Sequence, residues 1–348
     1  MLLISTIITN KIRLKYPPLA LMKVTIAQAV DTYLDNINLS RSENTSRSYG
    51  NALKSFLSVL EEYDLLPDKT PVQELPEDAI AWFALFLKDY APATEQLYLT
   101  AAAGFYEFLA AERLADPNLP RLRLLIRQRS RKAGQRLPQF PREQIEQVVE
   151  YAINLALLPF GSPDEHLRNL RDRAFLVTLA DTGLRVHEAC KLRRGDLDWN
   201  EGKALIIGKG DRQAVVRFST RAIHTLRDYL KLRARLDGGS GRQLAALPLF
   251  SRHDRGAGKK VKPITTATGR NIVAQRVGEA LGDDTSAQSI TPHSFRHYFV
   301  TAVLRGSGGN LKMAQELARH RNIAVTQRYA HLSDDELDRG FSDIFDQE

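Results

Sequence analysis

Cysteine is almost absent from this sequence of 348 residues, in which Cys190 is the only one. A lone cysteine excludes an intramolecular disulfide framework and a cysteine-rich zinc site. Long apolar runs are missing as well, because no stretch approaches the ~18 residues of a membrane span. The apolar N-terminus is followed, not preceded, by basic residues and lacks a small-residue cleavage site, so we reject a signal peptide. These absences favour a cytoplasmic protein without a membrane segment.

Composition and charge narrow the class of protein. Hydrophobic residues make up 43% and charged residues 26% of the chain, which is typical of a globular protein and excludes a disordered or collagen-like one. Lys and Arg number 49 against 41 Asp and Glu, which gives a net charge of +8. A basic surface favours a polyanionic partner, nucleic acid before membrane. The length predicts two domains or three.

Residues 23–116 predict a small helical domain. Thr25 and Gln28 match a capping box, and apolar residues then recur at helical spacing. Further helices are expected after Asn44 and over residues 76–88 and 94–113. The last of these should direct Leu97 inward, and Gly104 within it indicates close helix packing. Residues 1–22 are interpreted as an N-terminal extension, disordered or a mis-annotated start.

A basic stretch separates this domain from the rest. No acidic residue occurs between Pro117 and Arg142, and proline punctuates the stretch at both ends. We interpret residues 117–140 as a linker that tracks a phosphate backbone; the alternative is a merely solvated connector. Its candidate DNA-binding residues are Arg127, Arg129, Arg131 and Lys132.

Residues 141–348 predict a second, mainly helical domain with a small antiparallel β-sheet. Two short β-branched runs, 204–207 and 214–218, flank a hairpin tip at residues 208–212. Gly183 should end the helix over residues 164–181. A C-terminal tail helix is expected with an apolar stripe of Leu337, Phe341, Ile344 and Phe345, which packs either on its own domain or on a neighbouring protomer.

Four segments of this domain place unusual polar residues at structured positions. They contain Arg185 and Glu188 after a tight turn, Lys209 at the hairpin tip, His293 and Arg296 on one helix face, and His320 followed by Tyr329 and His331.

Around one phosphodiester, each of these residue types has a chemical use. Two guanidinium groups can neutralise the non-bridging oxygens. A tyrosine can attack phosphorus, a lysine can protonate the leaving oxygen, and a histidine can move the tyrosine proton. No carboxylate cluster is placed to hold two metal ions, so we infer a metal-independent mechanism without a cofactor.

The ordered set resembles the tyrosine recombinases, also called the phage integrase family, in the manner of the Xer proteins and integrases. The resemblance covers nearly the whole chain after residue 22 and implies a SAM-like core-binding domain ahead of the catalytic domain. It implies a site-specific recombinase or integrase that cuts double-stranded DNA through a 3′-phosphotyrosyl bond, as a tetramer with a Holliday junction intermediate. It implies catalytic roles for Arg185, Lys209, His293, Arg296, His320 and Tyr329, with Glu188 and His331 in support.

The sequence departs from this family just before His320, where the family usually has Gly and this chain has Arg319. If the backbone needs a positive φ there, Arg319 is strained; otherwise its side chain is a candidate DNA contact. The helix after Asn44 is a candidate reader of DNA sequence, with Arg41, Arg47 and Lys54 around it.

Other interpretations remain open at this point. A type IB topoisomerase-like relaxing enzyme shares the phosphotyrosine chemistry, and a catalytically silent DNA-binding protein could share the fold. His293 and His297 have a spacing that can bind zinc, but no Glu follows His293 as in a zinc-protease helix. We therefore expect no metal site, and we expect Cys190 to pack in the core.

Overall fold

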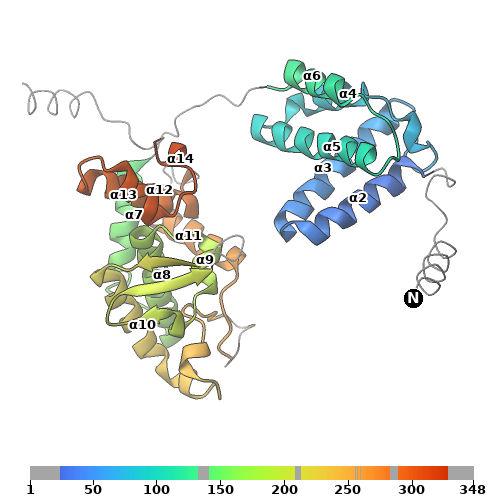
Figure 1. The fold of residues 1–348 in the computed structure, drawn as a ribbon. Helices are drawn as coiled ribbons and strands as arrows, with labels where there is room; N and C mark the ends of the chain where they lie inside the picture. The colour runs from blue at the N-terminus through green and yellow to red at the C-terminus, as the bar shows by residue number, and fades with distance from the viewer. Residues whose placement is uncertain are drawn as a thin grey trace, which may run out of the picture. The chain divides into compact units, whose positions relative to one another are not determined.

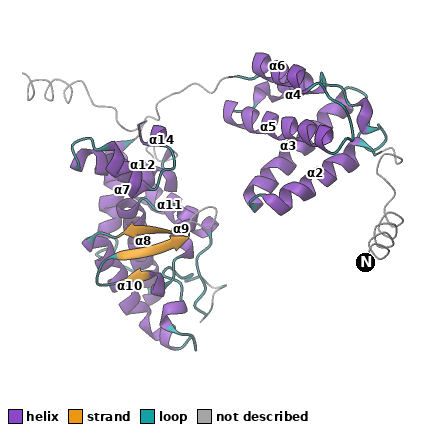
Figure 2. Cartoon of the chain, viewed as in Figure 1, coloured by secondary structure: helices purple, strands orange, loops and turns teal. Residues whose placement is uncertain are grey.

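The computed structural model describes residues 24–131, 141–207, 213–254, 256, 258, 260–282 and 289–327. The chain divides into two compact units, residues 1–136 and 137–348. Helices dominate both units, and the strands that the structure describes all belong to the second (Figures 1 and 2). No helix within the described ranges is long and apolar enough to cross a membrane. The expected fold class, mainly α with a small antiparallel sheet, is confirmed.

The first unit is a helical bundle with its own apolar core. The capping box is confirmed, since the Thr25 backbone donates to Gln28 and the Gln28 backbone donates back to Thr25. Gly104 allows the close packing expected of it, because a Cβ there would lie 2.5 Å from the Tyr33 hydroxyl. The expectation for Leu97 is wrong: this side chain is 40% exposed, and Leu99 is buried instead. The helices are α2 (Ile26–Ser40), α3 (Glu43–Glu62), α4 (Ala79–Phe86), α5 (Pro92–Ala111) and α6 (Leu119–Arg129).

Helix α6 corrects the interpretation of residues 117–140 as a linker. It packs against α4 and α5, with Leu122 and Leu125 buried in the core of the first unit. Arg121 fixes its N-terminal end by ion pairs with Glu77 at 3.0 Å and Asp78 at 2.8 Å. The basic stretch therefore begins as an amphipathic helix of the bundle.

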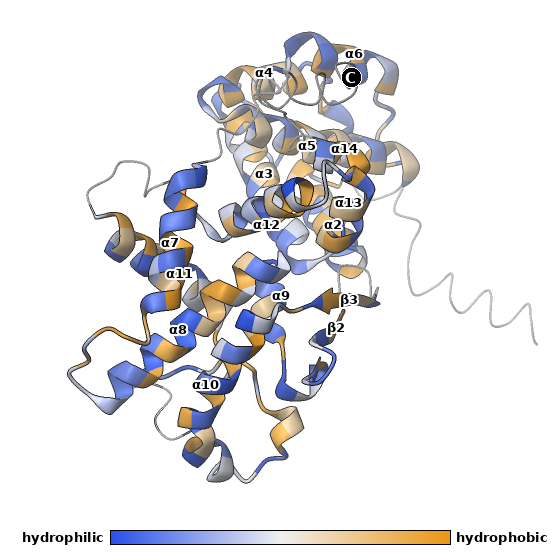
Figure 3. Cartoon of the chain, turned by 90° about the vertical axis from the view of Figure 1, so that its left-hand side faces the viewer, coloured by the Kyte–Doolittle hydropathy of each residue, from blue (hydrophilic) through white to orange (hydrophobic). Residues whose placement is uncertain are grey.

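The second unit is organised around α8 (Pro163–Thr182), in which most side chains are buried. This helix packs against four others, and its buried residues lie on nearly every side of it, including the polar Asn169, Arg171 and Asp172. The remaining helices are α7 (Arg142–Asn154), α9 (Val186–Lys191), α10 (Thr220–Gly238), α11 (Thr266–Leu281), α12 (Pro292–Gly306), α13 (Leu311–Ala318) and α14 (Ile323–Gln327). Figure 3 shows α10 banded with polar and apolar residues, as expected for a helix with one buried face.

The sheet has the antiparallel order β1 (Leu197–Asp198), β2 (Lys203–Ile207) and β3 (Gln213–Arg217). In the predicted hairpin, Ala204 pairs with Val216 and Leu205 with Val215. Ala204, Ile206 and Val216 face the core, whereas the alternate residues are exposed, in the two-residue period of a strand. The short strand β1 was not predicted.

Buried ion pairs hold distant segments of the second unit together. Asp172 on α8 accepts hydrogen bonds from Arg276 on α11, and both side chains are almost fully buried. On α10, Arg233 pairs with Asp237, which also pairs with Arg194. These charges satisfy one another away from the candidate site, so we interpret them as structural.

Candidate active site

The turn that follows α8 brings the site together. Gly183 ends the helix with φ +59°, as Gly was expected to do. A Cβ at this position would lie only 2.4 Å from Phe299 of α12, so both the backbone conformation and the packing require glycine. The Gly183 carbonyl accepts hydrogen bonds from Arg296 and Arg319, which come from two different segments.

Arg185 and Glu188 form one rigid pair at the start of α9. Arg185 Nη1 donates to Glu188 Oε1 at 2.8 Å, and the Arg185 backbone N–H donates to Glu188 Oε2 at 2.9 Å. Burial raises the pKa of Glu188, but these bonds and the nearby Arg319 outweigh it, so the pKa lies below its ordinary value. Glu188 is therefore a buried carboxylate that holds Arg185, whose own side chain remains 44% exposed.

Helix α12 supplies His293 and Arg296, three residues apart on one face as predicted. Arg296 is 2% exposed and donates to the backbone carbonyls of Gly183 and Ala318. It thereby ties the end of α8 to the end of α13. These two backbone carbonyls fix the direction of the guanidinium.

Arg319 follows α13 with φ 59° and ψ 42°, in the left-handed region. The first of the two sequence alternatives is therefore correct, and the conformation costs about 1–2 kcal/mol for a residue with a Cβ. The side chain turns inward: Nη2 lies 3.4 Å from Glu188 Oε2 and 3.4 Å from the Gly183 carbonyl. With a side-chain exposure of 12%, Arg319 faces the site's interior, unlike the surface DNA contact of the second alternative.

His320 is oriented by a residue of α14. Its Nδ1 lies 2.9 Å from the hydroxyl of Thr326, which is fully buried. Gln315 binds both backbone groups of His320: its carbonyl accepts from the His320 N–H at 3.0 Å, and its side-chain Nε2 donates to the His320 carbonyl at 3.1 Å. His320 is thus fixed from both sides of the turn.

Burial and the nearby arginines keep the histidines of the site neutral near pH 7. Burial lowers the pKa of His320 to about 4, with further lowering by the charges of Arg296 and Arg185. Burial and the same two arginines also lower the pKa of His293. His297 has a pKa of about 4 because of burial and its neighbour His293, whose ring it meets edge to face at 4.5 Å. Neutral imidazoles can accept a proton or a hydrogen bond.

The structure thus brings together Arg185, Glu188, His293, Arg296 and His320, which the sequence selected as one set. Lys209, Tyr329 and His331 lie outside the described residues, as do the tail helix and the N-terminal extension. No group of three potential metal ligands occurs in the part of the chain that is described.

The candidate DNA-binding residues of the first unit have different surroundings. Arg41, Lys54, Arg127 and Arg129 are exposed, and Lys132 is outside the described residues. Arg131 instead bonds inward to the buried Glu95, from its backbone N–H at 2.9 Å and from Nε at 2.5 Å. It is therefore largely engaged in holding the end of α6.

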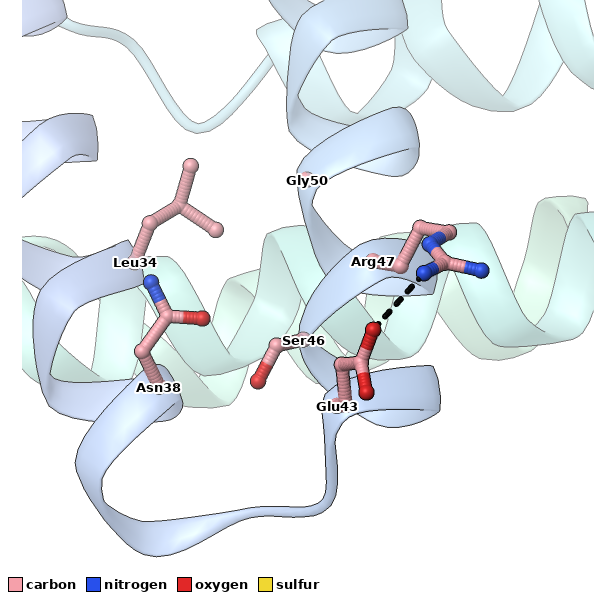
Figure 4. Close-up of a pocket in the computed structure, with 6 residues that line it drawn as sticks. All are labelled: Leu34, Asn38, Glu43, Ser46, Arg47 and Gly50. Atoms are coloured by element: carbon pink, nitrogen blue, oxygen red, sulfur yellow. Dashed lines mark hydrogen bonds and ion pairs between the residues drawn. The ribbon is translucent and has the colours of Figure 1, made fainter. Parts of the chain in front are cut away.

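Arg47 borders an open groove between α2 and α3. Figure 4 shows Leu34 and Asn38 on one side and Ser46, Gly50 and the Arg47–Glu43 ion pair on the other. The pair measures 2.9 Å and both side chains are highly exposed, so it contributes little to stability and leaves Arg47 able to change partner.

Three features of the site were not selected from the sequence. The Gly183 carbonyl was seen only as a helix end, not as a shared hydrogen-bond acceptor. Thr326 carries no signal beyond its short distance from His320 in the chain. The inward direction of Arg319 depends on its φ, which its residue type does not encode.

Comparison with known proteins decides the family. The model of the phage integrase family matches residues 140–336, which is more than half of the chain. The chain belongs to the phage integrase family. Members of this family are tyrosine recombinases, which cleave and rejoin DNA.

Bacterial recombinases are among the similar sequences. The tyrosine recombinase XerC of Bacillus pumilus is 33% identical over 245 residues, which cover 69% of this chain and 70% of that protein. XerD of Oceanobacillus iheyensis is 27% identical over 88% of this chain and 94% of its own length. The match to XerC of Pelobacter propionicus is 35% identical but shorter, covering 50% of this chain and about half, 52%, of that relative.

Solved recombinase structures share the fold. XerH bound to a palindromic difH substrate in a post-cleavage complex gives a TM-score of 0.64 at 18% identity, covering 93% of this chain and 85% of that one. The Tn1549 transposon integrase in complex with transposon right-end DNA gives 0.63 at 17% identity, covering 93% of this chain and 100% of that one. The family match over residues 140–336 contains all the positions selected for catalysis, including Lys209 and Tyr329.

Proposed function

We propose that this member of the phage integrase family is a site-specific recombinase that cuts and rejoins double-stranded DNA through a 3′-phosphotyrosyl intermediate. The observation that carries the proposal is the set of Arg185, Arg296, His293 and His320 around the Gly183 turn. Two cations and two neutral imidazoles converge there: burial lowers the pKa of both histidines, and the charges of the two arginines lower it further. Such a site suits a phosphodiester, whose negative charge grows in the transition state.

The proposed first step transfers the phosphoryl group from DNA to the protein. The Tyr329 hydroxyl attacks phosphorus while the bond from phosphorus to the 5′-oxygen breaks. His293 helps to remove the tyrosine proton, and Lys209 donates a proton to the departing 5′-oxygen. Arg185 and Arg296 bind the non-bridging oxygens. The products are a 3′-phosphotyrosyl bond and a free 5′-hydroxyl.

The remaining polar residues assist this step. Glu188 orients Arg185, and His320, held by Thr326, donates a hydrogen bond to the phosphate. His331 supports the tyrosine segment. Rejoining reverses the step with the 5′-hydroxyl of another strand, so the phosphotyrosyl bond conserves the energy and no nucleotide is consumed.

The assembly we propose has four protomers on two DNA sites, which exchange strands in two rounds through a Holliday junction. In each protomer both the first unit and the catalytic unit would contact the duplex. The exposed Arg41, Lys54, Arg127 and Arg129 would contact phosphates, and Arg47 borders a groove at which bases could be read. The related structures bound to DNA support this proposal.

Covalent trapping tests the proposed chemistry. The Tyr329→Phe variant first selects binding sites from a random duplex library, so that the target sequence is known. A nicked suicide duplex with that site is then incubated with wild-type protein in EDTA, and a denaturing gel reveals any protein–DNA adduct. The control is Tyr63→Phe, which keeps the ring stacked on Trp82 at 4.2 Å.

We expect an adduct with the wild-type protein and the Tyr63→Phe control and none with Tyr329→Phe. An adduct that persists in Tyr329→Phe would move the nucleophile to another residue. No adduct with the wild-type protein on a bound site would favour a silent DNA-binding protein. Relaxation of supercoils without recombinant products would favour the topoisomerase-like alternative.

A further inference from the structure

Arg319 occupies a backbone conformation that its side chain makes unfavourable. Among the described residues, Asp64, Arg113 and Arg319 are the non-glycine residues with a positive φ. Asp64 and Arg113 lie in the first unit, whereas Arg319 immediately precedes His320 in the site. Backbone strain persists at a functional site only where the surrounding contacts hold it in place, so the contacts of the Arg319 side chain indicate its role.

The contacts of Arg319 reach the supports of both phosphate-binding arginines. Its Nη2 lies 3.4 Å from Oε2 of Glu188, the carboxylate that holds Arg185. The same nitrogen lies 3.4 Å from the Gly183 carbonyl, which also accepts from Arg296. Arg319 therefore contacts two supports of the site, Gly183 and Glu188, which both lie more than a hundred residues before it in the chain.

The charges in this group explain why a second cation is useful. Arg185 and Glu188 alone form a neutral pair at 2.8 Å, and a neutral pair attracts a phosphate weakly. Arg319 lies on the other oxygen of the same carboxylate, with a side-chain exposure of only 12%. The three residues together carry one net positive charge, and the cation exposed to a ligand is Arg185.

We propose that Arg319 is a positioning residue, which balances the charge of Glu188 so that Arg185 is held in place and still attracts the scissile phosphate. The proposal rests on the proposed function and adds to it a residue that does not touch DNA. It differs from the sequence-based expectation of a direct DNA contact, for which the guanidinium would have to face solvent.

The two roles have different kinetic consequences. A direct phosphate contact mainly strengthens DNA binding, so its removal raises the dissociation constant. A positioning residue acts when charge grows on the phosphate, so its removal slows cleavage on fully bound DNA. Residues that hold metal ligands in place are typically worth about 10- to 100-fold, and we expect a similar scale for a residue that holds Arg185 in place.

The principal variant is Arg319→Gly, because glycine keeps the left-handed backbone without strain. The matched control is Arg113→Gly, at an exposed arginine of the first unit with φ 57°. Arg319→Lys keeps the charge and the backbone strain but loses the forked geometry. Each protein is compared by its single-turnover rate of adduct formation on saturating suicide duplex and by its dissociation constant for the same duplex.

We expect Arg319→Gly to slow adduct formation about 10-fold or more with a dissociation constant within about 2-fold of the wild type. Arg113→Gly should leave both values unchanged, and Arg319→Lys should recover part of the rate. In a Glu188→Gln background, removal of the Arg319 side chain should have a much smaller effect, because the charge that it balances is gone. A merely structural residue would show neither the rescue by lysine nor this dependence on Glu188.

The outcomes separate this inference from the proposed function. A wild-type rate in Arg319→Gly, with adduct still lost in Tyr329→Phe, would overturn the role of Arg319 and leave the recombinase chemistry intact. A higher dissociation constant, with an unchanged rate of adduct formation on saturating duplex, would establish the direct DNA contact instead. No adduct with the wild-type protein on a bound site would overturn both. If Arg319→Gly unfolds at a lower temperature than the wild type, the Arg319→Lys variant, measured with and without Glu188→Gln, decides the question.

Discussion

The Gly183→Ala variant tests the packing on which the site depends. Gly183 has φ +59°, and an added Cβ would lie 2.4 Å from Phe299 Cδ1 and 2.9 Å from Cγ. The left-handed conformation costs alanine about 1–2 kcal/mol. Displacing the Phe299 ring costs a further 1–3 kcal/mol or so. We therefore expect roughly 2–5 kcal/mol of lost stability in the second unit.

That loss is large enough to measure as a shift in melting temperature. For a unit of this size, each kcal/mol corresponds to about 2–4 °C, so the unfolding midpoint should fall by roughly 4–20 °C. The two tryptophans, Trp82 and Trp199, lie in different units. In a Trp82→Phe background, fluorescence therefore follows the second unit through Trp199.

A glycine of the same unit provides the control. Gly278 lies within α11, and a Cβ there would meet nothing within 4 Å. Gly278→Ala should leave the unfolding midpoint unchanged or raise it, because alanine's higher helix propensity adds up to about 1 kcal/mol of stability. If Gly183→Ala melted with the wild type, the close approach to Phe299 and the need for a positive φ would both be refuted. Slower adduct formation should accompany the destabilisation, because the Gly183 carbonyl holds two arginines.

Three further results are expected. Leu122→Ala should destabilise the first unit by about 2–4 kcal/mol, whereas the exposed Leu124→Ala should change it by less than about 0.5 kcal/mol; equal effects in thermal unfolding would show that α6 is not packed as described. Glu95→Gln should lower stability at pH 7 by about 1–3 kcal/mol. Burial raises the pKa of Glu95, but hydrogen bonds from Arg131 and Lys88 outweigh it, so the pKa in the folded protein lies below its ordinary value. The stabilisation by Glu95 is therefore present above the ordinary carboxyl pKa and disappears as the pH falls through the pKa of the folded protein. A stability difference between wild type and Glu95→Gln that persisted in strong acid would contradict this. His320 should titrate near pH 4 by NMR. Because the unfolded chain takes up the proton near pH 6.5, the stability that depends on neutral His320 should be complete above about pH 6.5 and decline as the pH falls toward 4. An ordinary pKa would mean that His320 is neither buried nor close to the arginines.

Local signals predicted much of the secondary structure. The capping box at Thr25, the helix end at Gly183 and the hairpin strands are all decided by neighbouring residues, and all three are confirmed. The spacing of His293 and Arg296 likewise placed them on one helix face. These features need no knowledge of the tertiary fold.

Tertiary packing decided what the sequence left open. Leu122 and Leu125 are buried by α4 and α5, a fact that the surrounding arginines concealed. Leu97 fits the apolar stripe of its helix, but its side chain remains 40% exposed in the folded bundle. The direction of Arg319 follows from the positive φ at the end of α13, which the residue type does not encode, so sequence reasoning could offer only two alternatives.

The ion pairs of α6 affect how salt should act on this protein. Arg121 and Arg131 are already paired with carboxylates of their own unit, so folding has displaced the small ions that would otherwise accompany them. The salt dependence of DNA binding counts the ions that leave the DNA when basic side chains replace them. Residues 117–142 should therefore release fewer ions than their basic composition indicates. The slope of affinity against salt concentration would report the surface that remains after folding, not the number of arginines in the sequence.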